Sequence, residues 1–457
     1  MSTPLEKSPA SSEQQHEPTS SNTLLYTHTF FSPEAAAARK ALIPSYIVPL
    51  IYNAILLWAC VALFFGSLLK NNDLSRITVT GVNLDDGPFG AGLINGIKGS
   101  LSAPGSLLRW DFPSITGDGD ASSRDTILQE RSWAVLQISA NASSNLQAAL
   151  KRGEASYDPH SAATLYFASA RNQVTTLSVT LPPLMSLVNG IISQLAINST
   201  ATFLQANQDT SLATALQCPQ CLASPFAVKQ IDLIPFSSAA AFGTLNTGLI
   251  FVRPSPSHLI PKQLTTSQLL TFTFNTFTIL HASASLHGHL FTLPTTLTIR
   301  FLSSLAAYIF LSLMYTLALL PFSIPLTGHF HSPATGFTVL WLLNCATMSA
   351  CGLAMESVFT LIGMQWAPYF LNVWIIANVS GAFAGVEIMP RFYEYGYAMP
   401  FYHCMQATRT VVFGTKNHLG VNFGVLGAWM GVGWVGGWGF TWWRMGRGRR
   451  EGVHRVP

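Results

Sequence analysis

Apolar runs alternate with stretches of mixed polarity along the chain, and the apolar runs define its expected membrane segments. The first run, residues 47–69, contains 23 residues without a charge. Because about 20 apolar residues suffice to cross a bilayer, this run predicts a membrane-spanning helix. Four further runs lie near the C-terminus, at residues 299–322, 335–355, 364–386 and 421–443. The hydropathy pattern alone therefore predicts five spans.

The stretch that follows the first span mixes polar and apolar residues. RITVTGVNL at 76–84 and RSWAVLQIS at 131–139 favour strands, whereas ASSNLQAALKRG at 142–153 favours a helix. Turn-forming residues such as DDGPFG separate these segments. We therefore expect a folded α+β domain over residues 70–236, which is long enough to have its own core.

The composition is that of an integral membrane protein. Of 457 residues, 49% are hydrophobic and 10% are charged, whereas soluble domains carry roughly 25% charged residues. Residues 1–40 are instead rich in Ser, Glu, Gln, Thr and Pro, which predicts a disordered cytoplasmic tail. Because this polar tail precedes the first apolar run, that run predicts a stable span rather than a cleaved signal peptide.

Charge near the C-terminus predicts the orientation of the chain. Five arginines occupy the segment 444–457 and favour a basic cytoplasmic tail beside anionic lipid. If the α+β domain lies outside the cytoplasm, both termini lie inside only with an even number of spans. We therefore expect a sixth, short span at residues 237–252, followed by a cytoplasmic loop at 253–298. Residues 265–282 are the competing choice, weakened by their Thr, Ser and Asn content.

The segment between the last two spans, residues 387–420, carries almost every charge of the C-terminal membrane region. Ionised groups are costly in hydrocarbon, so this segment must lie at the interface, re-enter the bilayer under protein cover, or line a polar cavity. Pro390, Gly396 and Pro400 interrupt helix propagation and favour a re-entrant or interfacial element. The candidate functional or gating residues are Glu387, Arg391, Glu394 and Arg409, together with Glu356 at the end of the span 335–355.

The sequence leaves two roles open for these charges. The four in the segment 387–420 could pair with one another and be structural, or they could open as a gate for substrate or lipid headgroups. Glu356 could be a polar site on an export path, or it could reach into the headgroups from the end of its helix.

Glycines in the last span favour close packing of helices. Two GxxxG spacings involve Gly427, Gly431, Gly433 and Gly437, and small residues let helix backbones approach each other. The expected contact lies either within the helix bundle or across a homodimer.

Two polar features of the α+β domain bear on its compartment. Cys218 and Cys221 have the spacing of a redox pair or of half a zinc site, but no second CxxC or HxxxH follows in the domain. We therefore expect no metal and a local disulfide, which an oxidising exterior favours. Asn141 and Asn198 begin acceptor sequons for N-glycosylation, which suit a surface facing the secretory lumen or the cell exterior.

Stretches along most of the chain carry a family resemblance. They include VTGVNLDDGP, ERSWAVLQISANASSNLQAAL and YDPHSAATLYFASARNQ in the α+β domain, and NVSGAFAGVEIMPRFYEYGYAMPFYH followed by ATRTVVFGTKNHLGVNFGVLGAW near the C-terminus. Over about residues 45–443 the chain thereby resembles the fungal nitrosoguanidine-resistance membrane protein family, whose architecture is similar to ABC-2-type permeases. The resemblance implies one span, a large outer domain and five further spans in the plasma membrane. The chain departs from the family at the second span, where RPSPSHLIPK interrupts the apolar run.

The sequence thus predicts an α-helical polytopic membrane protein of about six transmembrane helices, with an α+β extracytoplasmic domain inserted between helices 1 and 2. It has no GxxxxGK[ST] loop, no defensible catalytic triad or carboxylate pair, and no folded basic module. We therefore expect no cofactor, no enzymatic activity and no nucleic-acid partner.

The resemblance implies a function in resistance to toxic compounds, with membrane lipids and a small toxic compound as partners. Resistance would come from export, which needs a separate energy-coupling partner, or from altered lipid organisation. The alternative is a non-transporting scaffold that binds a partner through its outer domain.

Overall fold

The computed structural model describes residues 74–101, 108–113, 118–206, 214–237, 293–363, 366–382 and 385–450, with scattered positions between 33 and 67. The chain divides into two compact units, Met1–Ile55 and Leu56–Pro457. The predicted tail 1–40, first span 47–69, second span 237–252 and loop 253–298 lie largely outside the described residues.

A five-stranded mixed sheet forms the middle of the domain that follows the first predicted span. Its strands are β1 (Thr78–Asn83), β2 (Arg109–Asp111), β3 (Ala134–Ile138), β4 (Ala163–Phe167) and β5 (Val228–Asp232), in the order β2-β1-β3-β4-β5. Only β3 and β4 pair antiparallel; the other neighbours are parallel. The strands predicted within 76–84 and 131–139 are confirmed as β1 and β3.

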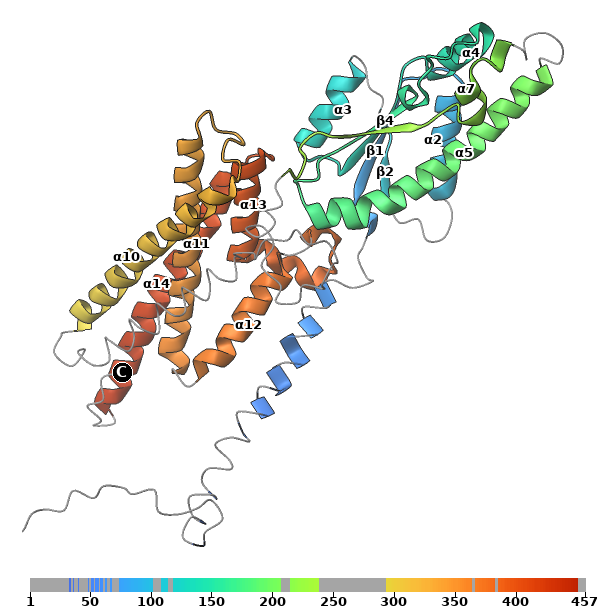
Figure 1. Cartoon of the computed structure of the whole chain (residues 1–457). Helices are drawn as coiled ribbons and strands as arrows, with labels where there is room; N and C mark the ends of the chain where they lie inside the picture. The colour runs from blue at the N-terminus through green and yellow to red at the C-terminus, as the bar shows by residue number, and fades with distance from the viewer. Residues whose placement is uncertain are drawn as a thin grey trace, which may run out of the picture. The chain divides into compact units, whose positions relative to one another are not determined.

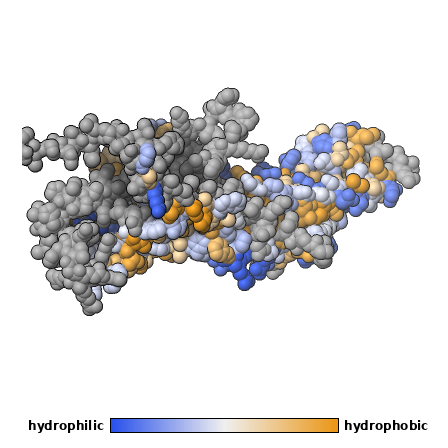
Figure 2. All heavy atoms as spheres, turned by 90° about the horizontal axis from the view of Figure 1, so that it is seen from below, coloured by the Kyte–Doolittle hydropathy of each residue, from blue (hydrophilic) through white to orange (hydrophobic). Residues whose placement is uncertain are grey.

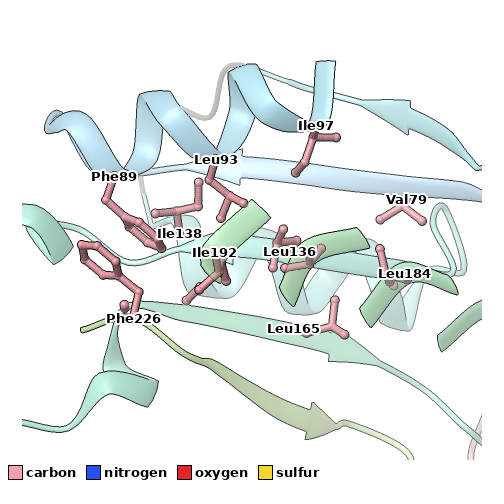
Figure 3. Close-up of a cluster of buried hydrophobic side chains, with 14 of the residues drawn as sticks. Val79, Phe89, Leu93, Ile97, Leu136, Ile138, Leu165, Leu184, Ile192 and Phe226 are labelled. Atoms are coloured by element: carbon pink, nitrogen blue, oxygen red, sulfur yellow. The ribbon is translucent and has the colours of Figure 1, made fainter. Parts of the chain in front are cut away.

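Helices cover both faces of this sheet. They are α2 (Pro88–Leu101), α3 (Gly119–Leu128), α4 (Ala142–Arg152), α5 (Leu181–Ala206) and the short α7 (Pro219–Ala223). On one face, Leu93 of α2 and Leu184 of α5 pack with Leu136 of β3 in the main apolar cluster (Figure 3). On the other face, Ile127 of α3 packs against Val135. The helix predicted at 142–153 is confirmed as α4, which ends at Gly153 in the left-handed conformation with φ +63°.

Among the described residues, four helices are long and apolar enough to cross a membrane by length and composition, namely Val174–Ala206, Thr298–Phe322, Pro333–Ile362 and Leu419–Trp443. The first consists of a π-helical turn (Val174–Thr180) and α5. Its apolar side chains Leu184, Val188 and Ile192 are buried in the core of the sheet domain. Much of the apolar character of this helix is therefore used in covering the sheet.

The other three long helices form the C-terminal bundle with two shorter ones. The bundle contains α10 (Leu293–Leu319), α11 (Pro333–Ile362), α12 (Ala367–Ser380), α13 (Pro400–Phe413) and α14 (Leu419–Arg450). Helices α10, α11 and α14 lie side by side (Figure 1). Large apolar side chains such as Phe310 and Val435 point outward, and apolar residues are interspersed with polar ones on the surface seen in Figure 2.

The helix at the predicted span 364–386 is shorter than expected. Helix α12 has 14 residues, about 21 Å at 1.5 Å per residue, whereas the hydrocarbon core is about 30 Å thick. After α12 the backbone passes close to the following segment, because a Cβ added to Gly381 would lie 2.7 Å from Cα of Gly396. The last helix, α14, is longer than the predicted span 421–443. It continues to Arg450 and so includes part of the segment 444–457, which was predicted as a tail.

A buried carboxylate joins the starts of two helices on the sheet. Asp85 is 3% exposed and accepts hydrogen bonds from the backbone nitrogens of Gly90 in α2 and Ser143 in α4, at 3.0 and 3.1 Å. The Ser143 hydroxyl also donates to Asp85, at 2.5 Å. The first amides of a helix have no partner within the helix, so Asp85 satisfies donors of both helices.

We expect Asp85→Ala to lower the free energy of unfolding of the sheet domain by about 2 to 3 kcal/mol, because buried amides lose a charged acceptor. Urea unfolding of the purified full chain in detergent measures this loss. Asp86→Ala removes the exposed neighbouring carboxylate and is the matched control. Equal destabilisation by both substitutions would contradict the role given to Asp85.

Candidate functional site

The first charged site lies inside the helical bundle, between α10 and α11. Arg300 Nε donates to Glu356 Oε1 at 3.0 Å, and the two side chains are only 12% and 13% exposed. Arg300 also contacts the Thr360 hydroxyl at 3.4 Å. A paired carboxylate and guanidinium avoid much of the cost that either charge would have alone beside apolar helices.

Helix α14 closes this site from the other side. Gly433, Trp434 and Trp438 line a small cavity with the ion pair. A Cβ added to Gly433 would lie 2.7 Å from the carbonyl carbon of Leu353, so this glycine lets the backbones of α14 and α11 touch. The cavity encloses about 30 Å³, on the order of two water molecules.

The other three glycines singled out from the sequence are placed differently. Gly427, Gly431 and Gly437 have no atom within 4 Å of an added Cβ among the described residues. These three glycines therefore make no close helix–helix contact with the described residues. A homodimer contact through them stays a prediction.

The second charged site lies where the sheet domain meets the segment that follows α12. Its pocket is lined by four ionisable residues, Glu130, Arg171, Glu387 and Arg409, and by Trp133, Asn172, Ala382, Gly385, Tyr402, Met405, Gln406 and Thr415. The sequence singled out Glu387 and Arg409, and the fold brings to them one carboxylate and one guanidinium from the sheet domain.

Arg171 is held within this pocket by the sheet domain. Its guanidinium lies 3.9 Å from the centre of the Trp133 ring and donates from Nη1 to the Ser132 carbonyl at 3.0 Å. Burial lowers the pKa of the Arg171 guanidinium, while the carboxylates of Glu130 and Glu387 act in the opposite direction. The stacking on Trp133 and the hydrogen bond to Ser132 thus fix the position of the Arg171 guanidinium in the pocket that it shares with both carboxylates.

The two carboxylates have different partners. Glu130 Oε2 lies 3.7 Å from His418 Nε2, just before α14. Within the part of the chain that the structure describes, Glu387 and Arg409 form no ion pair within 4.0 Å. The pocket thus contains a carboxylate and a guanidinium that form no ion pair with each other.

Backbone and apolar contacts fix the segment against the sheet domain. Gly385 donates its N–H to the Thr175 hydroxyl at 2.9 Å, and Lys416 Nζ donates to the Gln129 carbonyl at 3.1 Å. Ile388 and Met389, which belong to or follow the short 3-10 turn Val386–Ile388, are fully buried in the same apolar cluster as the strands. The beginning of the segment 387–420 is therefore part of the core of the sheet domain.

The remaining candidates from the segment lie outside this pocket. Glu394 pairs with Arg76 at 3.0 Å, rather than with another charge of the segment. Arg391 is exposed. Among the described residues, none of the four charges of the segment therefore forms an ion pair with another; Glu394 pairs with Arg76, and Glu387 and Arg409 share a pocket with Arg171 and Glu130.

Two important partners were missed in the sequence analysis. Arg300 was visible as the one basic residue in the apolar run 299–322, and this could have marked it as a counter-ion for Glu356. Arg171 had no such signal, because it follows β4 in a polar stretch and lies 216 positions before Glu387.

The polar features of the sheet domain are placed as follows. A disulfide joins Cys218 and Cys221, whose Cα atoms are 5.4 Å apart, across the start of α7. Asn141 and Asn198 are both exposed. Among the described residues, no group of three or more His, Cys, Asp or Glu side chains could hold a metal ion.

The long apolar helices and their enclosed ion pair define a membrane-embedded, mainly helical protein that also carries an α/β sheet domain. Over residues 50–435 the chain matches the family described as "Protein of unknown function (DUF3533)", and it belongs to that family. No solved structure matches the chain.

The ion pair in the bundle makes a stability prediction. Arg300→Met or Glu356→Met alone leaves one buried charge without its partner, so each should lower the unfolding free energy by about 3 kcal/mol or more. The double substitution should cost much less than the sum of the two. Thermal unfolding of the four proteins in the same detergent measures the coupling, and additive losses would contradict a direct interaction.

Proposed function

We propose that this protein contributes to resistance against toxic compounds by acting on amphiphilic molecules within the plasma membrane, either exporting them or altering lipid organisation. The observation that carries the proposal is the Arg300–Glu356 pair. Ionisable groups inside a membrane bundle are costly and usually serve a function. The resemblance to the nitrosoguanidine-resistance family supplies the link to resistance.

The surroundings of the pair favour an amphiphile that enters from the lipid. Trp434 and Trp438 line the cavity and are 46% and 40% exposed, so they form a partly open apolar wall beside the charges. A drug-sized ligand needs a cavity of about 300 to 1,000 Å³, and the enclosed space here is about 30 Å³. Export would therefore require α14 to move away from α11, with energy supplied by a separate partner.

The proposed topology places the sheet domain outside the cytoplasm and both termini inside. The disulfide and the two exposed sequons suit this compartment. The five arginines of the C-terminal tail suit the cytoplasmic side.

Cells that lack the gene, complemented with wild type or Glu356→Gln at matched surface level, test the function. We expect Glu356→Gln to lose most of the survival that wild type gives under an alkylating agent, because Arg300 loses its counter-charge. Labelled-drug accumulation and fluorescent-lipid distribution are followed in the same cells. The matched control is Glu154→Gln, which removes an exposed carboxylate of the sheet domain.

The two readouts separate the mechanisms. Lower drug accumulation with unchanged lipid distribution indicates export, and a changed lipid distribution without drug efflux indicates action on the bilayer. Full resistance with Glu356→Gln would contradict the proposal.

A scaffold function is the second candidate, and one observation favours it. Helix α5 exposes Ile197 and Leu204, which are 61% and 43% exposed, and a partner could cover this apolar surface. In that case Ile197→Ser with Leu204→Ser should abolish resistance, whereas Glu356→Gln should be tolerated.

A further inference from the structure

The pocket between the sheet domain and the interfacial segment contains balanced charges that come from separate elements. Arg171 and Glu130 belong to the sheet domain, Glu387 follows α12, and Arg409 lies on α13. The two guanidinium and two carboxylate groups give no net charge. A simple anion or cation in this pocket would be attracted by two of the charged groups and repelled by the other two.

Part of this charge lacks a direct partner within the described residues. Arg409 and Glu387 make no ion pair within 4.0 Å there, although each lines the pocket. Partly buried charges separated by more than hydrogen-bond distance need a bridging group, either water or a ligand. The Arg409 guanidinium and the Glu387 carboxylate can therefore both form hydrogen bonds to one molecule bound in the pocket.

We propose that this pocket binds the zwitterionic headgroup of an ethanolamine phospholipid, with the phosphate between Arg171 and Arg409 and the ammonium between Glu130 and Glu387. Guanidinium groups match phosphate oxygens in geometry. A primary ammonium donates up to three hydrogen bonds to carboxylates. One ligand thereby satisfies all four charges.

The surrounding residues favour ethanolamine over choline. A quaternary ammonium cannot donate hydrogen bonds and is recognised by open aromatic faces. Two aromatic residues line this pocket: a face of Trp133 is covered by the Arg171 guanidinium at 3.9 Å, and Tyr402 packs edge to face with Tyr397 and His403. The cationic group would therefore bind at the carboxylates of Glu130 and Glu387. Carboxylates accept hydrogen bonds, so they favour a cation with N–H groups, such as a primary ammonium.

The pocket lies at the end of the bundle where lipid headgroups are expected. Thr415 lines it, and α14, a helix of spanning length, begins at Leu419. The pocket is open to solvent, and the free space within it and before its mouth is about 480 Å³. The glycerol part of a lipid would therefore lie at the mouth.

Native mass spectrometry of the full chain in detergent tests this proposal. The probe is an equimolar mixture of ethanolamine, choline and glycerol phospholipids with identical acyl chains. We expect the ethanolamine lipid to be retained at least about tenfold better than either other lipid, because neither rival has an ammonium that can donate hydrogen bonds to Glu130 and Glu387. Arg409→Gln and Glu387→Gln should each remove this preference.

Arg391→Gln is the matched control, because Arg391 is an exposed arginine of the same segment that does not line the pocket. Equal retention of choline or glycerol lipid by wild type would overturn the proposal, even if a variant failed to fold. Loss of preference in Arg391→Gln to the same extent as in Arg409→Gln would also overturn it.

Competition by soluble glycerophosphoethanolamine identifies the source of the ligand. Displacement of the lipid would show that the free headgroup suffices, and no displacement would show that the bilayer lipid is required; either result supports the same headgroup chemistry. The assay does not measure resistance, so its outcome is independent of the function proposed above.

Discussion

Charged side chains beside apolar helices are costly unless another element supplies a counter-charge, and this cost accounts for the main polar contacts of the protein. Arg300 of α10 meets Glu356 of α11, and Gly433 of α14 allows the backbone of that helix to lie against α11 beside them. At the start of α14, Arg171 and Glu130 of the sheet domain share a pocket with Glu387 and Arg409. Each cluster joins elements that are distant in sequence.

The two clusters lie at different levels of α14, the second pocket just before the start of the helix and the first cavity around its middle. Thr415 of the second pocket precedes Leu419, where α14 begins, and Gly437 lines the first cavity. From residue 419 to residue 437 the helix rises by eighteen residue steps, about 27 Å, which is close to the thickness of the hydrocarbon core. An α14 that crosses a bilayer would thus have one cluster toward each polar boundary, with apolar helix between them.

The sheet domain does not depend on these clusters for its own core. Its strands are covered by α2, α4 and α5 on one face and by α3 on the other, and Asp85 holds the starts of α2 and α4 together. The burial of Ile388 and Met389 in this core ties the domain to the membrane bundle. Movement in the bundle would therefore be transmitted to the sheet domain through a packed contact.

Sequence patterns predicted the elements whose signal is local. The alternation in 76–84 indicated β1, and long apolar runs indicated three helices of the bundle. Helix α5 was not predicted, because its apolar face on the sheet and its apolar residues on the surface together hide the helical period. The meeting of residues from distant positions, such as Arg171 and Glu387 in one pocket, has no signature in one sequence, since it depends on how the whole chain folds.

The central claim is that the two charged clusters face opposite sides of a membrane. Thiol labelling with an impermeant reagent tests it most directly, using Asn417→Cys and Arg447→Cys in a chain whose free cysteines 60, 345, 351 and 404 have been replaced. We expect Asn417→Cys to react in intact cells and Arg447→Cys to react only after permeabilisation. Labelling of both positions from the same side would contradict the account.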